Sequence, residues 1–167
     1  LGASPHAVAA TRRTLFAKQL IDQTPLRMAE IAFAAGFSSV RRFNDAMRAV
    51  YGRPPRALRR AGAAGSDATS SPLELRLGYR PPYAWNSLLA FLAARAIPGV
   101  ECVSEDSYRR SFRQGSHTGW LEVRHLEASY QLRVGFHASG PLRLIDLAPR
   151  LRALFDLGAD PGEIAGQ

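Results

Sequence analysis

The chain has 167 residues and a formal net charge of +8, from 22 basic and 14 acidic side chains. Its single cysteine excludes an internal disulfide and a multi-cysteine zinc site, and no metal or cofactor is expected. The sequence has neither a long apolar run that would span a membrane nor a signal stretch, so we expect a cytoplasmic protein.

The positive charge is concentrated in the amino-terminal part. Residues 1–65 hold 11 basic and 3 acidic side chains, whereas residues 66–167 hold 11 of each. Every basic residue except Lys18 is an arginine, whose planar guanidinium suits phosphates and base edges. This division predicts two parts with different surfaces and a polyanion as the partner of the first part.

The first part is predicted to be entirely helical. Ser4 and Pro5 fit the start of a helix that runs to about Asp22, and apolar spacing predicts a short helix over 27–35. Gly36 can end that short helix because glycine tolerates the left-handed conformation.

A third helix is expected to begin after the N-cap Ser38 and to run to about Tyr51. Its apolar stripe would contain Phe43, Met47 and Val50. A short helix, a glycine turn and a second helix form a helix-turn-helix unit, whose second helix enters the major groove of DNA.

The side chains opposite the apolar stripe are the candidates for reading bases. Arg41 could fork onto a guanine edge, Asn44 could pair with adenine, and Val40 could touch a thymine methyl. Asp45 could accept from a cytosine amino group or orient Arg41. The alternative is an ordinary surface ion pair between Arg41 and Asp45 at i, i+4.

Other side chains of the first part are expected to contact phosphates, which set affinity rather than sequence preference. The expected phosphate contacts are Arg12, Arg13, Ser39, Arg42, Arg48, Arg53 and Arg56, together with Arg59 and Arg60.

Residues 17–60 closely resemble the second helix-turn-helix of AraC/XylS transcription regulators. The resemblance includes Ala29-Glu30-Ile31-Ala32, Gly36-Phe37-Ser38 and the Gly52-Arg53-Pro54-Pro55 ending. It implies that residues 1–60 form an AraC-type DNA-binding domain for double-stranded DNA, in which 5–22 is the joining helix and the first helix-turn-helix is mostly missing. It also implies that Val40, Arg41, Asn44 and Asp45 are base-facing.

The second part changes its periodicity. Residues 61–72 are small or polar and predict a flexible linker, and alternation then predicts a strand over 73–79. A helix over 85–96 and a last helix over 142–155 flank further strands at 100–104, 107–113, 120–126 and 129–137, with a turn-rich loop over 114–119. One antiparallel sheet backed by two helices is the expected α+β fold.

The residues of this part offer little chemistry. His125 and His137 could meet on facing strands, but a metal site is not the favoured interpretation, and Cys102 lacks the neighbours of a nucleophile. The glutamates Glu122 and Glu127 are expected to be solvated. The large aromatic side chains are expected to be core rather than a base-stacking platform, and they are Trp85, Phe91 and Trp120.

Residues 73–160 resemble the N-terminal domain of AlkA-type DNA-3-methyladenine glycosylases, on the segments 80–101, 107–112, 119–120 and 154–161. The resemblance implies a domain similar to half of a TATA-binding protein that abuts, but is not, the catalytic domain. Residues 161–167 would begin the missing helix-hairpin-helix glycosylase domain, which would pack on 73–167 and carry the catalytic aspartate. No catalytic residue is therefore assigned.

The combination resembles Ada-like fusions of a regulator of the alkylation response with a base-excision glycosylase. We therefore expect residues 1–167 to bind DNA, with RNA polymerase as a further candidate partner, and to lack glycosylase activity themselves. The alternative is an AraC-family regulator whose residues 73–167 bind a small-molecule effector.

Overall fold

The computed structural model describes residues 2, 4–59 and 73–159, and its contacts divide the chain into two compact units. The helical unit contains the amino-terminal helices with residues 141–147, and the sheet unit contains residues 73–140 and the residues from 148 onward. The predicted linker 61–72, the predicted start of a further domain at 161–167 and Arg60 lie outside the described residues.

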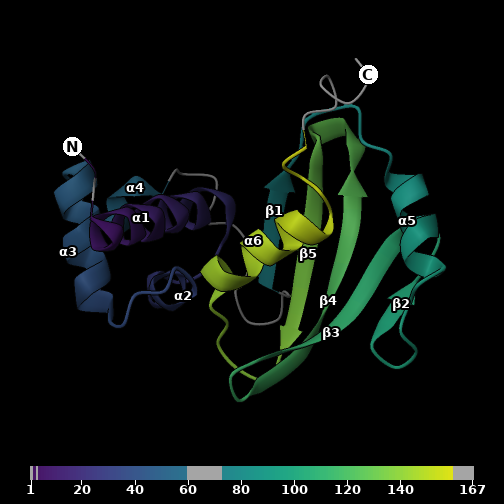
Figure 1. Cartoon of the computed structure of the whole chain (residues 1–167). Helices are drawn as coiled ribbons and strands as arrows, with labels where there is room; N and C mark the ends of the chain where they lie inside the picture. The colour runs from purple at the N-terminus through teal and green to yellow at the C-terminus, as the bar shows by residue number, and fades with distance from the viewer. Residues whose placement is uncertain (1, 3, 60–72, 160–167) are drawn as a thin grey trace. The chain divides into compact units, whose positions relative to one another are not determined.

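The amino-terminal part contains the three predicted helices and a short fourth helix after Pro54 that was not predicted from the sequence (Figure 1). The hydroxyl of Ser4 accepts from the Ala7 N–H at 3.2 Å, which caps the first helix at its expected start. Thr24 closes that helix, because its hydroxyl donates to the Leu20 carbonyl at 2.7 Å. The helices are α1 (Pro5–Gln23), α2 (Met28–Ala34), α3 (Val40–Tyr51) and α4 (Pro55–Leu58).

The core of the helical unit gathers fully buried side chains from α1, α2 and α3. Phe43 and Met47 are buried as the apolar stripe predicts, and they pack in the same core as Leu20, Ile21 and Ile31. Val50 differs, because 59% of it is exposed. The stripe prediction is therefore wrong at its last position.

The sheet unit is built on five antiparallel strands in the order β1-β5-β4-β3-β2. The strands β2 to β5 follow one another as hairpins, whereas β1 pairs with β5, for example Leu75 with Val134. The strands are β1 (Leu73–Gly78), β2 (Glu101–Val103), β3 (Ser107–Gln114), β4 (His117–Leu126) and β5 (Gln131–Ala138), with the 3-10 turn η1 (Glu127–Ser129) before β5.

The loop expected over 114–119 is shorter than predicted. Gln114 and His117 pair across the end of β3 and β4, which leaves a two-residue turn between them. Gly115 has a φ of +61° in this turn. Glycine adopts this left-handed conformation without the strain that a side chain would add, so it permits the tight turn.

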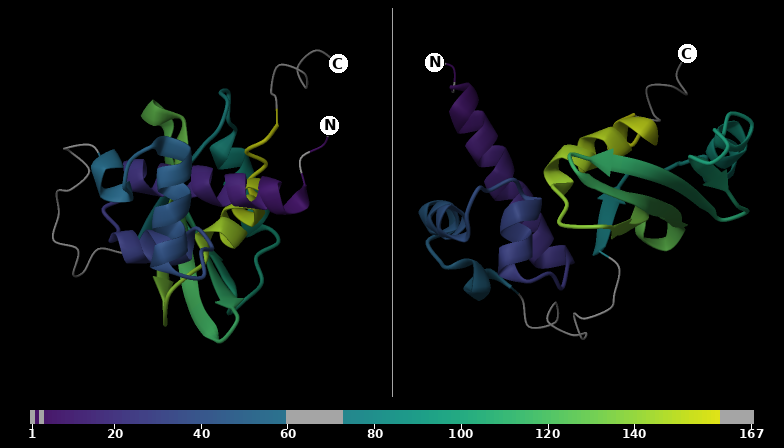
Figure 2. Two further views of the ribbon diagram at one scale, coloured as in Figure 1. Left: turned by 90° about the vertical axis from the view of Figure 1, so that its left-hand side faces the viewer. Right: turned by 90° about the horizontal axis from the view of Figure 1, so that it is seen from below.

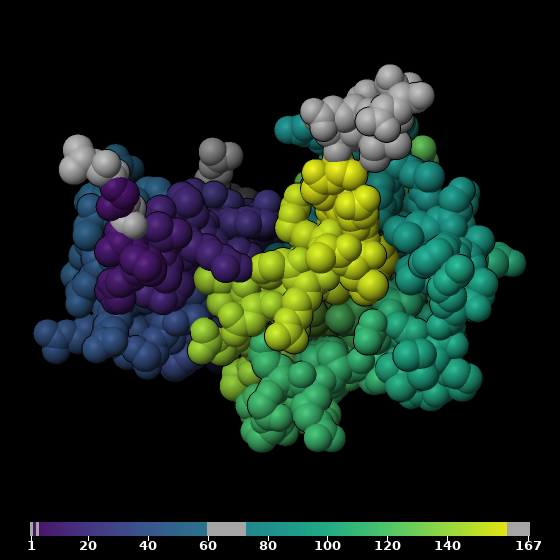
Figure 3. All heavy atoms as spheres, in the orientation of Figure 1, coloured from purple at the N-terminus to yellow at the C-terminus, as the bar shows by residue number. Residues whose placement is uncertain are grey.

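Two helices cover one face of the sheet. They are α5 (Trp85–Ala93), which ends three residues before its predicted end, and the part of α6 (Leu144–Leu154) from residue 148 onward, which belongs to the sheet unit. Figure 2 shows α6 lying along one side of the strands, and in Figure 3 its yellow atoms adjoin the green and teal atoms of the sheet unit. Leu75, Val123 and Val134 are buried on this face. The expected α+β domain with an antiparallel sheet is thus confirmed.

Candidate nucleic-acid interface

The turn between α2 and α3 has the geometry of a helix-turn-helix unit. At the start of α2, the Glu30 carboxylate accepts from the Arg27 N–H at 2.7 Å. Gly36 ends the helix with a φ of +81°. The buried Phe37 then packs edge to face on Phe43, with ring centroids 5.5 Å apart, and this contact fixes the direction in which α3 leaves the turn.

The N-cap of α3 is Ser39 rather than the predicted Ser38. Ser39 has the extended backbone that an N-cap needs, and its hydroxyl accepts from the Arg42 N–H at 3.2 Å. Ser38 lies one residue too early and instead accepts from the Arg42 guanidinium at 3.4 Å. The hydroxyl oxygen of Ser39, which was predicted to contact a phosphate, thus already accepts a hydrogen bond from the backbone of α3.

The four predicted base-facing residues all lie on the first two turns of α3. The side chain of Arg41 is 93% exposed and that of Asp45 is 64% exposed. Val40 and Asn44 lie half-buried on the adjoining stripe. The ion pair considered from the sequence is present with 4.0 Å between Arg41 Nε and Asp45 Oδ2, but a pair this long and exposed contributes little. It leaves the Arg41 guanidinium available to another partner.

The predicted phosphate contacts lie on several elements of the helical unit. Arg42 and Arg48 are exposed on α3, and Arg53 and Arg56 are exposed around the start of α4. On α1, Arg12 is exposed and Arg13 is half-buried; both lie in its middle turns.

Arg59, unlike the exposed arginines that were predicted with it as phosphate contacts, binds within the helical unit. Its guanidinium donates to the Leu26 carbonyl, which ties the end of α4 to the loop before α2. The Nε of Arg59 is buried without a hydrogen-bond partner among the described residues, and burial lowers the pKa of this side chain. The side chain is thus used inside the unit.

The histidines of the sheet unit do not meet. His125 is paired in register with Leu132 and contacts the Tyr79 hydroxyl at 2.5 Å, on the side of the sheet that carries the helices. His137 lies on the opposite face, stacked on Trp120 with ring centroids 3.8 Å apart. Among residues 4–59 and 73–159, no three His, Cys, Asp or Glu side chains are grouped as metal ligands.

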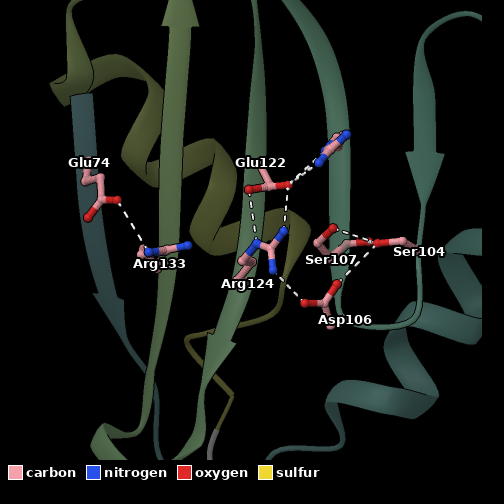
Figure 4. Close-up of polar contacts among 8 residues, drawn as sticks. Glu74, Ser104, Asp106, Ser107, Glu122, Arg124 and Arg133 are labelled. Carbon is pink, nitrogen blue, oxygen red and sulfur yellow. Dashed lines mark hydrogen bonds and ion pairs between the residues drawn. The ribbon is translucent and has the colours of Figure 1, made fainter. Parts of the chain in front are cut away.

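Glu122 is not the solvated glutamate that the sequence predicts. Its side chain is only 18% exposed and binds Arg124 at 3.1 Å (Figure 4) and Arg109 at 2.7 Å. Hydrogen bonding to Arg124, then to Arg109, outweighs the effect of burial and lowers the pKa of Glu122 to about 2. The alternation of residues along one strand could not predict this, because Arg109 comes from the neighbouring strand.

The aromatic side chains divide differently from the prediction. Trp85 is buried, with 6% exposed, as expected of a core residue. Trp120 is 40% exposed and Phe91 is 52% exposed, so the core prediction is wrong for both. Trp120 lies at an outward position of β4, and Phe91 on the outward side of α5.

Family models match both parts of the chain. The AlkA N-terminal domain matches residues 74–167, and a Helix-turn-helix domain matches residues 1–61. The chain belongs to the AlkA N-terminal domain family. The resemblance to a helix-turn-helix regulator joined to the AlkA N-terminal domain is thereby confirmed.

The chain is similar to curated relatives of greater length. Two strains of Mycobacterium tuberculosis, CDC 1551 / Oshkosh and ATCC 25618 / H37Rv, have a "Probable bifunctional transcriptional activator/DNA repair enzyme AlkA" that is 39% identical over 167 residues, or 98% of this chain. The "DNA-3-methyladenine glycosylase 2" of Escherichia coli strain K12 is 32% identical over 90 residues, or 54% of this chain.

The chain spans about a third of the length of these relatives, 33% of the mycobacterial proteins and 32% of the Escherichia coli protein. None of the helices in the described part of the chain has the length and apolar character needed to cross a membrane.

Proposed function

We propose that this chain is the DNA-binding part of a transcription regulator of the alkylation response that is fused to a DNA-3-methyladenine glycosylase of base excision repair. The observation that carries the proposal is the helix-turn-helix with exposed Arg41 on α3, in a chain 39% identical to relatives named as activator and repair enzyme. The proposed location is the cytoplasm.

In the proposed complex, α3 enters the major groove of double-stranded DNA. Arg41 and Asn44 face base edges, with Val40 and Asp45 beside them. Arg12, Arg13, Arg42, Arg48, Arg53 and Arg56 neutralise phosphates, and Ser39 lies where the helix start approaches the backbone. The proposed functional parts are residues 1–60 for DNA recognition and 73–160 as the neighbour of a glycosylase domain that packs on 73–167.

The family match over residues 74–167 supports this proposal over a small-molecule sensor. In the whole protein, the glycosylase would flip a damaged base from the stack before it breaks the glycosidic bond. We propose that residues 1–167 have no such activity themselves, and that RNA polymerase is a further partner of the regulator.

The experiment that tests the proposal selects a preferred duplex from random DNA and measures its affinity for wild type and Arg41→Ala. Loss of a bidentate arginine–guanine contact costs about 1–3 kcal/mol, so we expect roughly 5- to 150-fold weaker binding and relaxed preference at one base pair. Arg150→Ala, an exposed arginine on α6, is the matched control and should leave binding unchanged. Unchanged binding of Arg41→Ala to every sequence would contradict the assignment of α3.

A further inference from the structure

The face of the sheet turned away from α5 and α6 carries an excess of arginines. Side chains alternate along each strand, and on this face the described strands present five arginines and two glutamates. They are Arg76, Arg109, Arg113, Arg124 and Arg133 against Glu74 and Glu122. Because residues 66–167 hold equal numbers of basic and acidic side chains, this part has gathered positive charge on one face.

Three of these side chains form a row across neighbouring strands, which we call the arginine row: Arg76 on β1, Arg133 on β5 and Arg124 on β4. Arg76 is in register with Arg133, and Arg133 is in register with Arg124. Side chains directly opposite one another lie about 5 Å apart at Cβ, where like charges are destabilising. Charges often protect edge strands from pairing, but β5 and β4 are inner strands, so that explanation covers only Arg76.

The carboxylates of this face neutralise the row unevenly. Arg124 is held by Glu122 at 3.1 Å and by Asp106 at 2.6 Å, whereas Arg133 has a partly exposed contact with Glu74 at 3.6 Å (Figure 4). The side chain of Arg76 has no hydrogen bond or ion pair among the described residues. The β1 end of the row therefore carries two guanidiniums that are free, or nearly free, to bind an external anion.

The surroundings of Trp120, the aromatic side chain on the same face, favour double-stranded over single-stranded DNA as the ligand. A base stacks on an open aromatic ring face. His137 covers one face of the Trp120 ring at 3.8 Å, and the Arg109 guanidinium lies over the ring at 5.6 Å. What this face offers instead is guanidinium groups, which suit the phosphates of a continuous backbone.

We propose that the arginine row is a second, sequence-independent contact of this protein with duplex DNA, through phosphates of the DNA that flanks the site read by α3. The inference rests on the proposed DNA binding by α3. Because both contacts belong to one chain, DNA held by α3 meets the sheet unit at high effective concentration. Two additional phosphate contacts can therefore raise the affinity of the whole chain measurably.

The test measures the affinity of the whole chain for two duplexes that contain the selected site, one of about 15 and one of about 40 base pairs, or roughly one and a half and four helical turns. The variant is Arg76→Gln/Arg133→Gln. The matched control is Arg95→Gln/Arg150→Gln, which removes the same charge from exposed positions after α5 and on α6.

On the long duplex, we expect the row variant to reduce the slope of log affinity against log salt by about 2. Its affinity relative to wild type should therefore be roughly tenfold lower at about 50 mM salt than at about 200 mM. The short duplex and the control pair should show neither change. Arg76→Lys/Arg133→Lys should retain the wild-type slope.

The outcomes separate this inference from the proposed function. Absence of wild-type binding to the short duplex would contradict reading by α3 and, with it, the tethered contact proposed for the row. A row variant that matches the control on the long duplex would overturn the inference and leave an acidic protein segment as the fitting partner. A lysine pair that behaves like the glutamine pair would also overturn it, because charge would then not be the cause.

Discussion

At the scale of single residues, the same side-chain type has several uses in this chain. Arg41 is almost fully exposed on α3, Arg59 donates to a backbone carbonyl inside the helical unit, and Arg124 binds two carboxylates of the sheet unit. The sequence could predict Arg41 because a helix period places it opposite Phe43. It could not predict Arg59, whose use depends on a contact 33 residues away.

Glu122 provides a prediction about acid stability. Its pKa is lowered from the ordinary value of 4.5 to about 2, so the folded state binds a proton less readily than the unfolded state. The stabilisation is therefore complete above about pH 4.5 and is lost as the pH falls toward about 2. Glu122→Gln should lower the free energy of unfolding by about 1.5–3 kcal/mol at pH 7, with the difference from wild type shrinking near pH 2.

Urea unfolding of both proteins at pH 7 and pH 3 measures this difference. Glu74→Gln is the matched control, because Glu74 is 37% exposed and has a single 3.6 Å contact with an arginine of the same face. We expect less than about 1 kcal/mol from the control at either pH. An equal effect of the two substitutions at pH 7 would show that the double arginine contact adds nothing.

At the scale of elements, periodicity and end signals predicted most helices and strands, while the ends of elements depended on local backbone. Ser4 and Gly36 were identified correctly because their chemistry suits one role at a helix end. Between the adjacent Ser38 and Ser39, the residue type is the same, and only the backbone conformation decides which one caps α3.

Helix capping therefore gives a prediction with a built-in control. Ser39→Ala should lower the stability of the helical unit by about 1 kcal/mol, because the Arg42 N–H loses its acceptor. Ser38→Ala should cost a few tenths of a kcal/mol, since its hydroxyl has only a long contact with an exposed guanidinium. Thermal unfolding followed by circular dichroism measures both, and a larger loss from Ser38→Ala would contradict the observed cap.

At the scale of the whole molecule, charge is distributed unevenly in both units, although the net charge of each part of the sequence reveals this only for the first part. Residues 66–167 have no net charge, yet their strands place arginines on one face. Composition cannot show this, because the division of a strand into two faces matters only once the register is known. The alternation of residues around Arg76 and Arg133 could have predicted that these two arginines lie on the outward side of their strands.

The salt dependence of DNA binding tests how many charges the chain uses. If each of the six predicted phosphate-contacting arginines of the helical unit neutralises one phosphate, log affinity for a short duplex should fall with log salt with a slope of about −5. Fluorescence anisotropy between about 50 and 200 mM salt measures the slope. A slope shallower than about −2 would mean that most of these arginines do not reach the backbone.

The strand order of the sheet also has a consequence during synthesis. Strands β2 to β5 can form as successive hairpins, but β1 pairs with β5, whose first residue follows the end of β1 by about 53 positions. At about 5–20 residues per second, β1 waits roughly 3–10 s on the ribosome without a partner. Its three leucines, Leu73, Leu75 and Leu77, lack their strand partner throughout that interval, so this short segment of the nascent chain is open to chaperones and to aggregation.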